Sequence, residues 1–344
     1  ADLGALVSAH ATLDRMSFNL RSLTREELLD AAVDLAARQL ALPAFSSDIW
    51  QAERERWIAS IQEANTKPST VAASAYGKAV FGSHPYGAEP TAQSLGLIDT
   101  SMMAGFHARY FVPCHAKISI VGAVGREQAN ALVQRLLRHL PASSSCELLP
   151  LVDEVQPLTQ AQRLDIPFES AQTHILVGQP GIARQHPDYL PLIVGNYVLG
   201  GGGFVSRLTE QVREKRGLSY SVYSYFAPAL HPGPFVAGLQ TRPDQATQAL
   251  QLTRDIVNEF IRHGPTEQEL KAAQDNLIGG FALRIDSNRK LLDNLANIAW
   301  YELPANYLDT WTQKVQAVTR QDIQSAFQRH LSPQKMVSLI LGPV

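Results

Sequence analysis

Residues 106–113 read Phe-His-Ala-Arg-Tyr-Phe-Val-Pro, and Gly122 stands nine residues after Pro113. Residues 327–333 read Phe-Gln-Arg-His-Leu-Ser-Pro, and Gly342 stands nine residues after Pro333. Aligned on their prolines, the two segments are 220 residues apart (333 − 113). A fixed internal period constrains the fold more strongly than any local pattern does.

Two further landmarks give nearly the same offset. Pro43 and Pro265 are 222 residues apart, and Leu20 and Leu239 are 219 apart. We therefore expect two tandem copies of one unit, at residues 1–141 and 161–344, joined by a linker at 142–160 that is rich in Pro and Ser. Shifted back by this offset, the first copy begins some tens of residues before Ala1, so we expect its opening segment to lie outside this chain.

The hydrophobic periodicity predicts the same order of elements in both copies. Capping boxes are expected at Thr24/Glu27 and Thr266/Glu269. Early strands followed by helices and one late strand indicate an α+β fold, a mixed sheet in each copy covered on one face by helices. In the first copy we expect strands in 5–23 and 118–121 and helices from 24 to 42, 46 to 63, 68 to 81, 99 to 110 and 126 to 139. In the second we expect strands at 162–167, 172–179, 217–226, 233–240 and 336–341, and helices at 187–199, 243–262, 266–290 and within 291–329.

The composition is that of a globular protein and excludes several function classes. Of 344 residues, 45% are hydrophobic and 18% charged, and the formal net charge is −2. This charge gives no electrostatic basis for binding nucleic acid. No apolar run approaches the length of a transmembrane helix. The two cysteines, Cys114 and Cys146, lack metal-site spacing, and we expect two unconnected thiols in preference to a disulfide.

A run of four glycines, Gly200 to Gly203, followed by Phe204, is the most distinctive local feature. Such a run serves as a hinge or as a cradle for an anion or a peptide backbone. It lacks the third glycine in register and the preceding strand of a dinucleotide fingerprint, so nucleotide binding is excluded.

Beyond it, residues 213–222 read Arg-Glu-Lys-Arg-Gly-Leu-Ser-Tyr-Ser-Val. With the duplication, the segment Leu-Gly-Gly-Gly-Gly-Phe-Val-Ser-Arg-Leu at 199–208 and the loop His-Pro-Tyr-Gly at 84–87, this segment closely resembles the M16 zinc metallopeptidase family. That family includes pitrilysin, insulin-degrading enzyme and mitochondrial processing peptidase, and the resemblance spans nearly the whole chain. It implies a substrate-binding pair, an arginine and a tyrosine seven residues later, at Arg213 and Tyr220. It also implies substrate contacts at Gly200, Gly201, Gly202, Gly203 and Phe204.

From residue type alone, Arg213 reads as a solvated helix-end residue and Tyr220 as part of the core. In the family reading, Tyr220 shares a strand face with Leu218 and Val222, so its ring packs while its hydroxyl reaches a cleft. A guanidinium and a phenol that converge on a peptide carbonyl favour the negative charge that develops there during hydrolysis.

The metal half of the family's site is missing from this sequence. The family's His-x-x-Glu-His motif, which binds zinc and activates water, occurs nowhere in the chain. The resemblance puts the distal ligand, a glutamate, six residues after the run Glu-Arg-Glu-Arg at 53–56, where Gln62 stands. A neutral amide is a poor zinc ligand, and the adjacent Glu63 is rotated by about 100° around a helix. We therefore expect no metal on this chain, unless the alignment slips by one residue.

Some members of the family divide the work between a zinc-bearing chain and a chain that keeps only the Arg/Tyr pair. The leading hypothesis is such a non-catalytic subunit, which binds peptide and completes the active site of a zinc-bearing M16 partner in a heterodimer, or of a second copy in a homodimer. It would bind no cofactor itself and would not be active alone, and the cell envelope is favoured slightly over the cytoplasm. Two alternatives stay open: a truncated active zinc endopeptidase, and an inactive scaffold like the core subunits of a respiratory complex.

Overall fold

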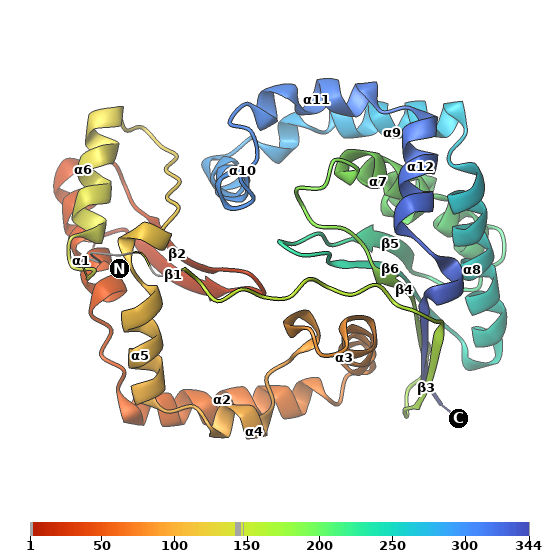
Figure 1. Cartoon of the computed structure of the whole chain (residues 1–344), viewed down its shortest axis with the longest axis horizontal. Coiled ribbons are helices and arrows are strands. Elements are labelled where there is room, and N and C mark those ends of the chain that lie inside the picture. The colour runs from red at the N-terminus through yellow and green to blue at the C-terminus, as the bar shows by residue number, and fades with distance from the viewer. Residues whose placement is uncertain (1–2, 142–145, 147, 344) are drawn as a thin grey trace. The chain divides into compact units, whose positions relative to one another are not determined.

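The computed structural model describes residues 3–141, 146 and 148–343, and it divides into two compact units that each draw on separated segments (Figure 1). Unit 1 comprises 1–61, 90–151 and 284–302, and unit 2 comprises 62–89, 152–283 and 303–344. The expected linker, 142–160, includes residues 142–145 and 147, which lie outside the described residues. Its described remainder forms neither helix nor strand.

Unit 1 is a hairpin with helices. Its elements are β1 (Leu6–Ala11), β2 (Met16–Arg21), α1 (Glu26–Ala41), α2 (Ser47–Ala64, ending just inside unit 2), α4 (Ala92–Gly96), α5 (Thr100–Tyr110), α6 (Arg126–Leu137) and α10 (Asn288–Trp300). The strands β1 and β2 pair antiparallel. Helix α1 packs against α6, and Arg135 joins them by ion pairs to Asp30 and Asp34 at 2.5 and 3.0 Å.

Two local predictions in unit 1 are wrong. Helix α1 begins at Glu26 after Arg25, which makes no side-chain cap bond, so the Thr24/Glu27 capping box does not form. Residues 118–121 form no strand. No strand among the described residues pairs with this segment. Without neighbouring strands, no ladder of hydrogen bonds can form.

The prediction of two unconnected thiols is also wrong, because Cys114 and Cys146 form a disulfide with their Cα atoms 6.0 Å apart. A separation of 32 residues carries no information about distance in space. The 3-10 turn Pro113–His115 brings Cys114 to the segment that contains Cys146.

Unit 2 holds a five-stranded mixed sheet in the order β3-β7-β4-β6-β5, with β3 and β7 parallel and the other pairs antiparallel. Its strands are β3 (Gln162–Pro167), β4 (Thr173–Pro180), β5 (Val222–Phe226), β6 (Pro234–Thr241) and β7 (Val337–Gly342). Its helices are α3 (Pro68–Phe81), α7 (Tyr189–Asn196), α8 (Ala246–His263), α9 (Glu267–Gly279), α11 (Tyr307–Ala317) and α12 (Arg320–His330). An α+β fold with a mixed sheet is therefore confirmed.

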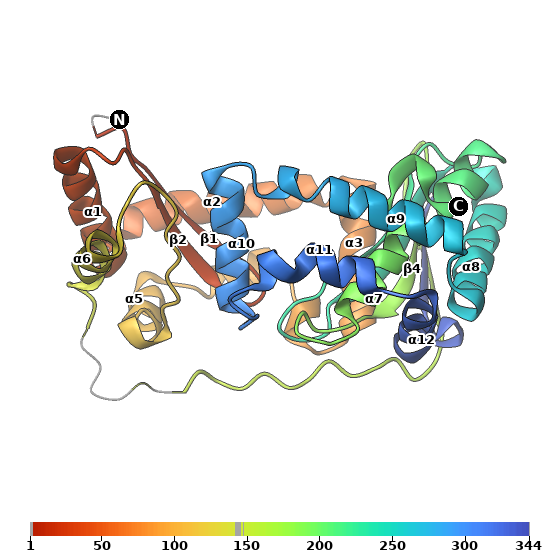
Figure 2. The same ribbon diagram turned by 90° about the horizontal axis from the view of Figure 1, so that it is seen from above.

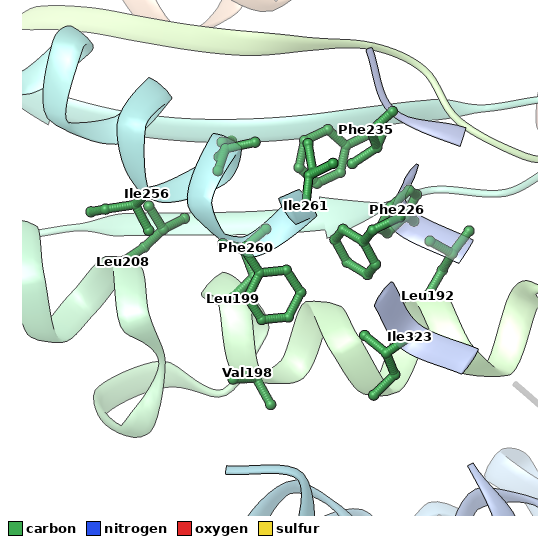
Figure 3. Close-up of a cluster of buried hydrophobic side chains, with 14 of the residues drawn as sticks. Leu192, Val198, Leu199, Leu208, Phe226, Phe235, Ile256, Phe260, Ile261 and Ile323 are labelled. Carbon is green, nitrogen blue, oxygen red and sulfur yellow. The ribbon is translucent and has the colours of Figure 1, made fainter. Parts of the chain in front are cut away.

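The main core lies between one face of this sheet and α7, α8 and α12. Phe226 and Phe235 from the strands and Phe260 of α8 lie in this core (Figure 3). Phe327 of α12 joins them, and the contacting ring centroids are 4.8 to 5.8 Å apart. Fully burying one such side chain stabilises the fold by about 1.5–3 kcal/mol. Helices α9 and α11 run side by side beyond this layer, and the side chain of Gln274 donates to the carbonyls of Val315 and Val318 at their junction (Figure 2).

The expectation that helices cover only one face of the sheet is wrong for unit 2. Helix α3, from the first half of the sequence, packs on the opposite face through Ala72, Tyr76 and Val80. That face presents Val236 of β6 and Val337, Leu339 and Leu341 of β7, all buried. A sheet that is apolar on both faces needs a cover on both. The phenol of Tyr76 also donates to the carbonyl of Phe235 at 2.8 Å.

The units also exchange one helix each. Helix α3 of the first half belongs to unit 2, and α10 of the second half belongs to unit 1. The two helices begin at Pro68 and Asn288, which are 220 residues apart (288 − 68).

Candidate functional site

The glycine run lies in unit 2, where α7 widens into a π-helical turn, Tyr197–Gly201, before a 3-10 turn at Gly203–Val205. The buried Asn196 and Ser224 attach this turn to β5. The Asn196 amide donates to the Ser224 carbonyl at 2.9 Å, and the Ser224 hydroxyl donates back to the amide oxygen at 2.7 Å. A π-helical turn inside an α-helix often marks a functional position.

Three of the glycines are required by geometry, and one of them is Gly202, whose Cβ would lie 2.6 Å from the Tyr197 carbonyl oxygen. A Cβ at Gly200 would lie 2.4 Å from the Ser224 hydroxyl and 2.5 Å from its backbone nitrogen. Gly203 has open space around it but a φ of +60°, in the left-handed region that favours glycine. The run is therefore needed for close packing against β5 and for the turn that follows, and it presents Phe204 with 70% of its surface exposed.

Arg213 lies in a second π-helical turn, Thr209–Glu214, which confirms its expected place near a helix end. The helix stops at Gly217, which has a φ of +60° and whose amide donates to the Arg213 carbonyl at 2.9 Å. The Arg213 guanidinium lies over the ring of Phe204, 4.7 Å from its centroid, and pairs with Glu214 at 3.3 Å. Stacking and ion pairing restrain the guanidinium next to the glycine run.

Tyr220 does not pack as the sequence suggested. Strand β5 begins only at Val222, and Tyr220 is 86% exposed while Leu218 and Val222 are buried. The reason is a local bend at Ser219, whose hydroxyl accepts from the Ser221 amide at 3.1 Å and donates to the Ser221 carbonyl at 2.7 Å. A serine that bonds to the backbone two residues ahead competes with strand geometry and turns the residue between them outward.

Arg213 and Tyr220 line the same small, open cavity of about 130 Å³. The other lining residues come from the glycine run, the second π-helical turn and the start of β5: Gly203, Phe204, Thr209, Ser221 and Val222. The structure therefore brings together the arginine, the tyrosine and the end of the glycine run, which are separated by up to 17 residues in the sequence (220 − 203).

The sequence analysis missed the role of Arg207, which lies between the glycine run and the second π-helical turn. Its guanidinium makes a two-point ion pair with Glu269, both contacts 2.7 Å, and donates to the Gly264 carbonyl at 3.0 Å. Glu269 also completes the Thr266 capping box of α9, which is confirmed. These bonds hold the pKa of the Glu269 carboxyl below its usual range against the opposing effect of burial. The sequence displays the Thr266/Glu269 capping box, but it does not show that Glu269 also pairs with Arg207.

The His-Pro-Tyr-Gly loop forms a 3-10 turn, Pro85–Gly87, that holds the described end of the expected linker. The His84 ring accepts from the Tyr86 amide at 3.1 Å, so its other nitrogen donates to the Asp153 carbonyl at 3.0 Å. The Tyr86 hydroxyl accepts from the His231 amide, and the His231 ring contacts Glu154 at 3.1 Å. This motif acts here through packing and hydrogen bonds.

The position that the resemblance assigns to the distal zinc ligand carries an amide, not a carboxylate. Gln62 is exposed near the end of α2, and the adjacent Glu63 pairs with Lys67 at 2.9 Å. Within the described residues, two groups could supply three metal ligands, and neither includes these positions. One of these groups is His186, Asp188 and His330. Its carboxylate is already paired with the guanidinium of Arg329, which contacts the two Asp188 oxygens at 2.8 and 2.9 Å.

The fold and the cavity define an α+β protein whose arginine and tyrosine are presented together at an open site. Residues 98–277, just over half of the chain, match the family described as "Peptidase M16 inactive domain". The chain belongs to the peptidase M16 family, and the resemblance drawn from the sequence is confirmed.

Relatives of this chain match it over different shares of its length. An uncharacterized zinc protease of Mycobacterium tuberculosis is 26% identical over 324 residues, 92% of this chain and 72% of that protein. A non-peptidase homolog of Helicobacter pylori is 37% identical over 133 residues, 38% of this chain and 30% of that protein. The crystal structure of a peptidase M16 inactive domain from Pseudomonas fluorescens superposes with a TM-score of 0.94 at 32% identity, covering all of this chain and 82% of that one.

No helix among the described residues is long and apolar enough to cross a membrane.

Proposed function

We propose that this chain is the non-catalytic, peptide-binding subunit of a two-chain M16 peptidase, and that Arg213 and Tyr220 act on a peptide bound at the partner's zinc. The observation that carries the proposal is the cavity that both residues line, with Tyr220 exposed at its edge. The exposed position of Tyr220 suits a residue that contacts a substrate or a second chain, because burying an exposed tyrosine on binding is favourable.

Arg213 and Tyr220 can both stabilise negative charge on a substrate oxygen. The phenol and the guanidinium both donate hydrogen bonds, and neither needs to change its protonation state to do so. Directed at the oxygen of the scissile carbonyl, they stabilise the charge that develops there. Removing one such donor costs about 2.7–4 kcal/mol of barrier in other hydrolases.

The catalytic metal is assigned to the partner. This chain has no His-x-x-Glu-His, and Gln62 replaces the carboxylate at the distal position. The matched relative from H. pylori is described as a non-peptidase homolog, which supports a role without independent hydrolysis.

Strand β5 offers a place for an extended peptide. It is an edge strand of the unit 2 sheet, and its first residue, Val222, lines the cavity beside Tyr220. A peptide that adds to this edge forms main-chain hydrogen bonds while its side chains reach the cavity and Phe204.

The same proposal includes the tandem organisation, with homologous repeats at 1–141 and 161–344 and a linker at 142–160. The exchange of α3 and α10 at an offset of 220 supports it. The disulfide Cys114–Cys146 supports an oxidising compartment, the cell envelope, over the cytoplasm.

The test is a mixing assay with a zinc-bearing M16 chain from the same organism. Peptide hydrolysis is expected only in the mixture, and Tyr220→Phe is expected to lower its rate about 100-fold, as loss of one such donor does. The matched control is Tyr110→Phe, which removes a phenol from α5 of unit 1 and is expected to change the rate less than twofold.

Two results would contradict the proposal. Hydrolysis by the full-length gene product alone, abolished by a chelator, would support the alternative in which this chain is a truncated active peptidase. An unchanged rate with Tyr220→Phe and with Arg213→Lys would support an inactive scaffold.

A further inference from the structure

Unit 1 contains a cluster of three side chains with ligand chemistry at the disulfide. The 3-10 turn Pro113–His115 presents Cys114 and His115 consecutively, and both face Cys146. One ligand atom from each of the three lies within 4.8 Å of the other two. The His115 Nδ1 atom lies 3.6 Å from the Cys146 sulfur.

We propose that Cys114, His115 and Cys146 bind a zinc ion when the disulfide is reduced. The 3-10 turn and residue 146 are then joined in one of two ways. A disulfide links them under oxidising conditions, and a metal ion links them under reducing conditions. Two thiolates and one imidazole are a ligand set that zinc prefers and that Ca²⁺ and Mg²⁺ do not.

The distances fit a tetrahedral ion. With Zn–N of about 2.0 Å and Zn–S of about 2.3 Å, the nitrogen and a sulfur on one ion lie about 3.5 Å apart. The 3.6 Å between His115 Nδ1 and the Cys146 sulfur already has this value. Two sulfurs on one ion lie about 3.8 Å apart, so the sulfurs must separate, which rotation of the side chains achieves once the bond is broken.

The steps balance. A dithiol reductant transfers two electrons and two protons to the disulfide, giving two thiols and the oxidised form of the reductant. Zinc then displaces the two thiol protons and accepts the lone pair of the neutral imidazole. With three protein ligands, the fourth position is left for water.

This site is separate from the proposed function. The cluster lies in unit 1, whereas the cavity with Arg213 and Tyr220 lies in unit 2. The ion would have a structural role, closing the chain between residues 114 and 146, and the catalytic zinc remains assigned to a partner. The expectation that this chain binds no cofactor therefore applies to its oxidised form.

The test uses the full chain in two redox states. A sample reduced with a phosphine is desalted without oxygen, incubated with one equivalent of zinc, freed of unbound metal and analysed by elemental analysis. One zinc per chain is expected in the reduced sample, and less than a tenth of that in the oxidised sample. Cobalt added to the reduced chain is expected to give the intense absorption of a thiolate-bound ion.

Three variants assign the ligands. Cys146→Ser is expected to abolish stoichiometric binding and the cobalt–thiolate absorption. His115→Asn is expected to weaken zinc binding by at least about 10-fold, because even a group that only orients a ligand contributes about 10–100-fold. The matched control, His10→Asn, changes an exposed histidine of β1 in the same unit and is expected to bind as the parent chain does.

The proposal is overturned if the reduced chain binds no stoichiometric zinc. It is also overturned if zinc binds equally to the oxidised and reduced chains, or if His115→Asn binds zinc as tightly as the parent does. None of these results bears on Tyr220, which is tested by hydrolysis.

Discussion

Replacing Gly200 with alanine tests whether the glycine run is required by packing against β5. The new Cβ would lie 2.4 Å from the Ser224 hydroxyl, 2.5 Å from the Ser224 amide nitrogen and 2.7 Å from a methyl of Leu208. The hydroxyl can rotate, but the amide belongs to β5 and cannot move without disturbing its pairing with β6. Overpacking of this kind costs about 1–3 kcal/mol.

The matched control is Gly77→Ala in α3, which belongs to the same unit. A Cβ at Gly77 meets no atom within 4 Å, so alanine is expected to stabilise this helix by about 0.5–1 kcal/mol. The two substitutions are chemically identical and are expected to change the free energy of unfolding in opposite directions.

Urea unfolding of both variants, followed by far-ultraviolet circular dichroism, measures the difference. Because the chain has two units, the transition that responds to Gly77→Ala identifies unit 2, and the free energy is taken from that transition. The reasoning is refuted if Gly200→Ala unfolds at the same or a higher urea concentration than the parent chain. A loss of stability with no change in Tyr220-dependent hydrolysis would mean that the run supports the fold and not the cavity.

Two further predictions concern charged groups of unit 2. Glu269→Gln weakens both contacts to Arg207 and is expected to cost about 1–3 kcal/mol of stability in denaturant unfolding, since each carboxylate contact is charge-assisted and shielded. Glu267→Gln, a control with its side chain 80% exposed, is expected to cost less than about 0.5 kcal/mol, and equal effects would disprove the role given to Glu269. Burial keeps the pKa of His330 below its ordinary value, and the nearby Arg329 and His186 act in the same direction while Asp188 opposes them. The unfolded chain then takes up the proton first, so stability is expected to fall as pH drops below about 6.5, and a His330→Gln variant with an unchanged slope between pH 7 and 5 would contradict this.

The sequence by itself determined most elements in the second half of the chain, the Thr266 capping box of α9 and the position of Arg213 near a helix end. Each depends on neighbours within a few residues, so local periodicity and side-chain type carry the information. The resemblance to the M16 family also came from contiguous motifs, which a sequence displays directly. The single helix expected at 266–290 was wrong, because α9 ends at Gly279 and α10 begins only at Asn288.

The tertiary structure decided what depends on distant partners. Residues 118–121 have a strand-like sequence but form no strand without adjacent strands, and α3 covers a sheet whose strands lie later in the chain. The link between Cys114 and Cys146 likewise required the three-dimensional path of the backbone. Tyr220 shows the limit most clearly, because alternation placed it in the core while the Ser219 bend exposes it. Its orientation depends on two hydrogen bonds, and periodicity does not encode which of two competing backbone geometries is stabilised.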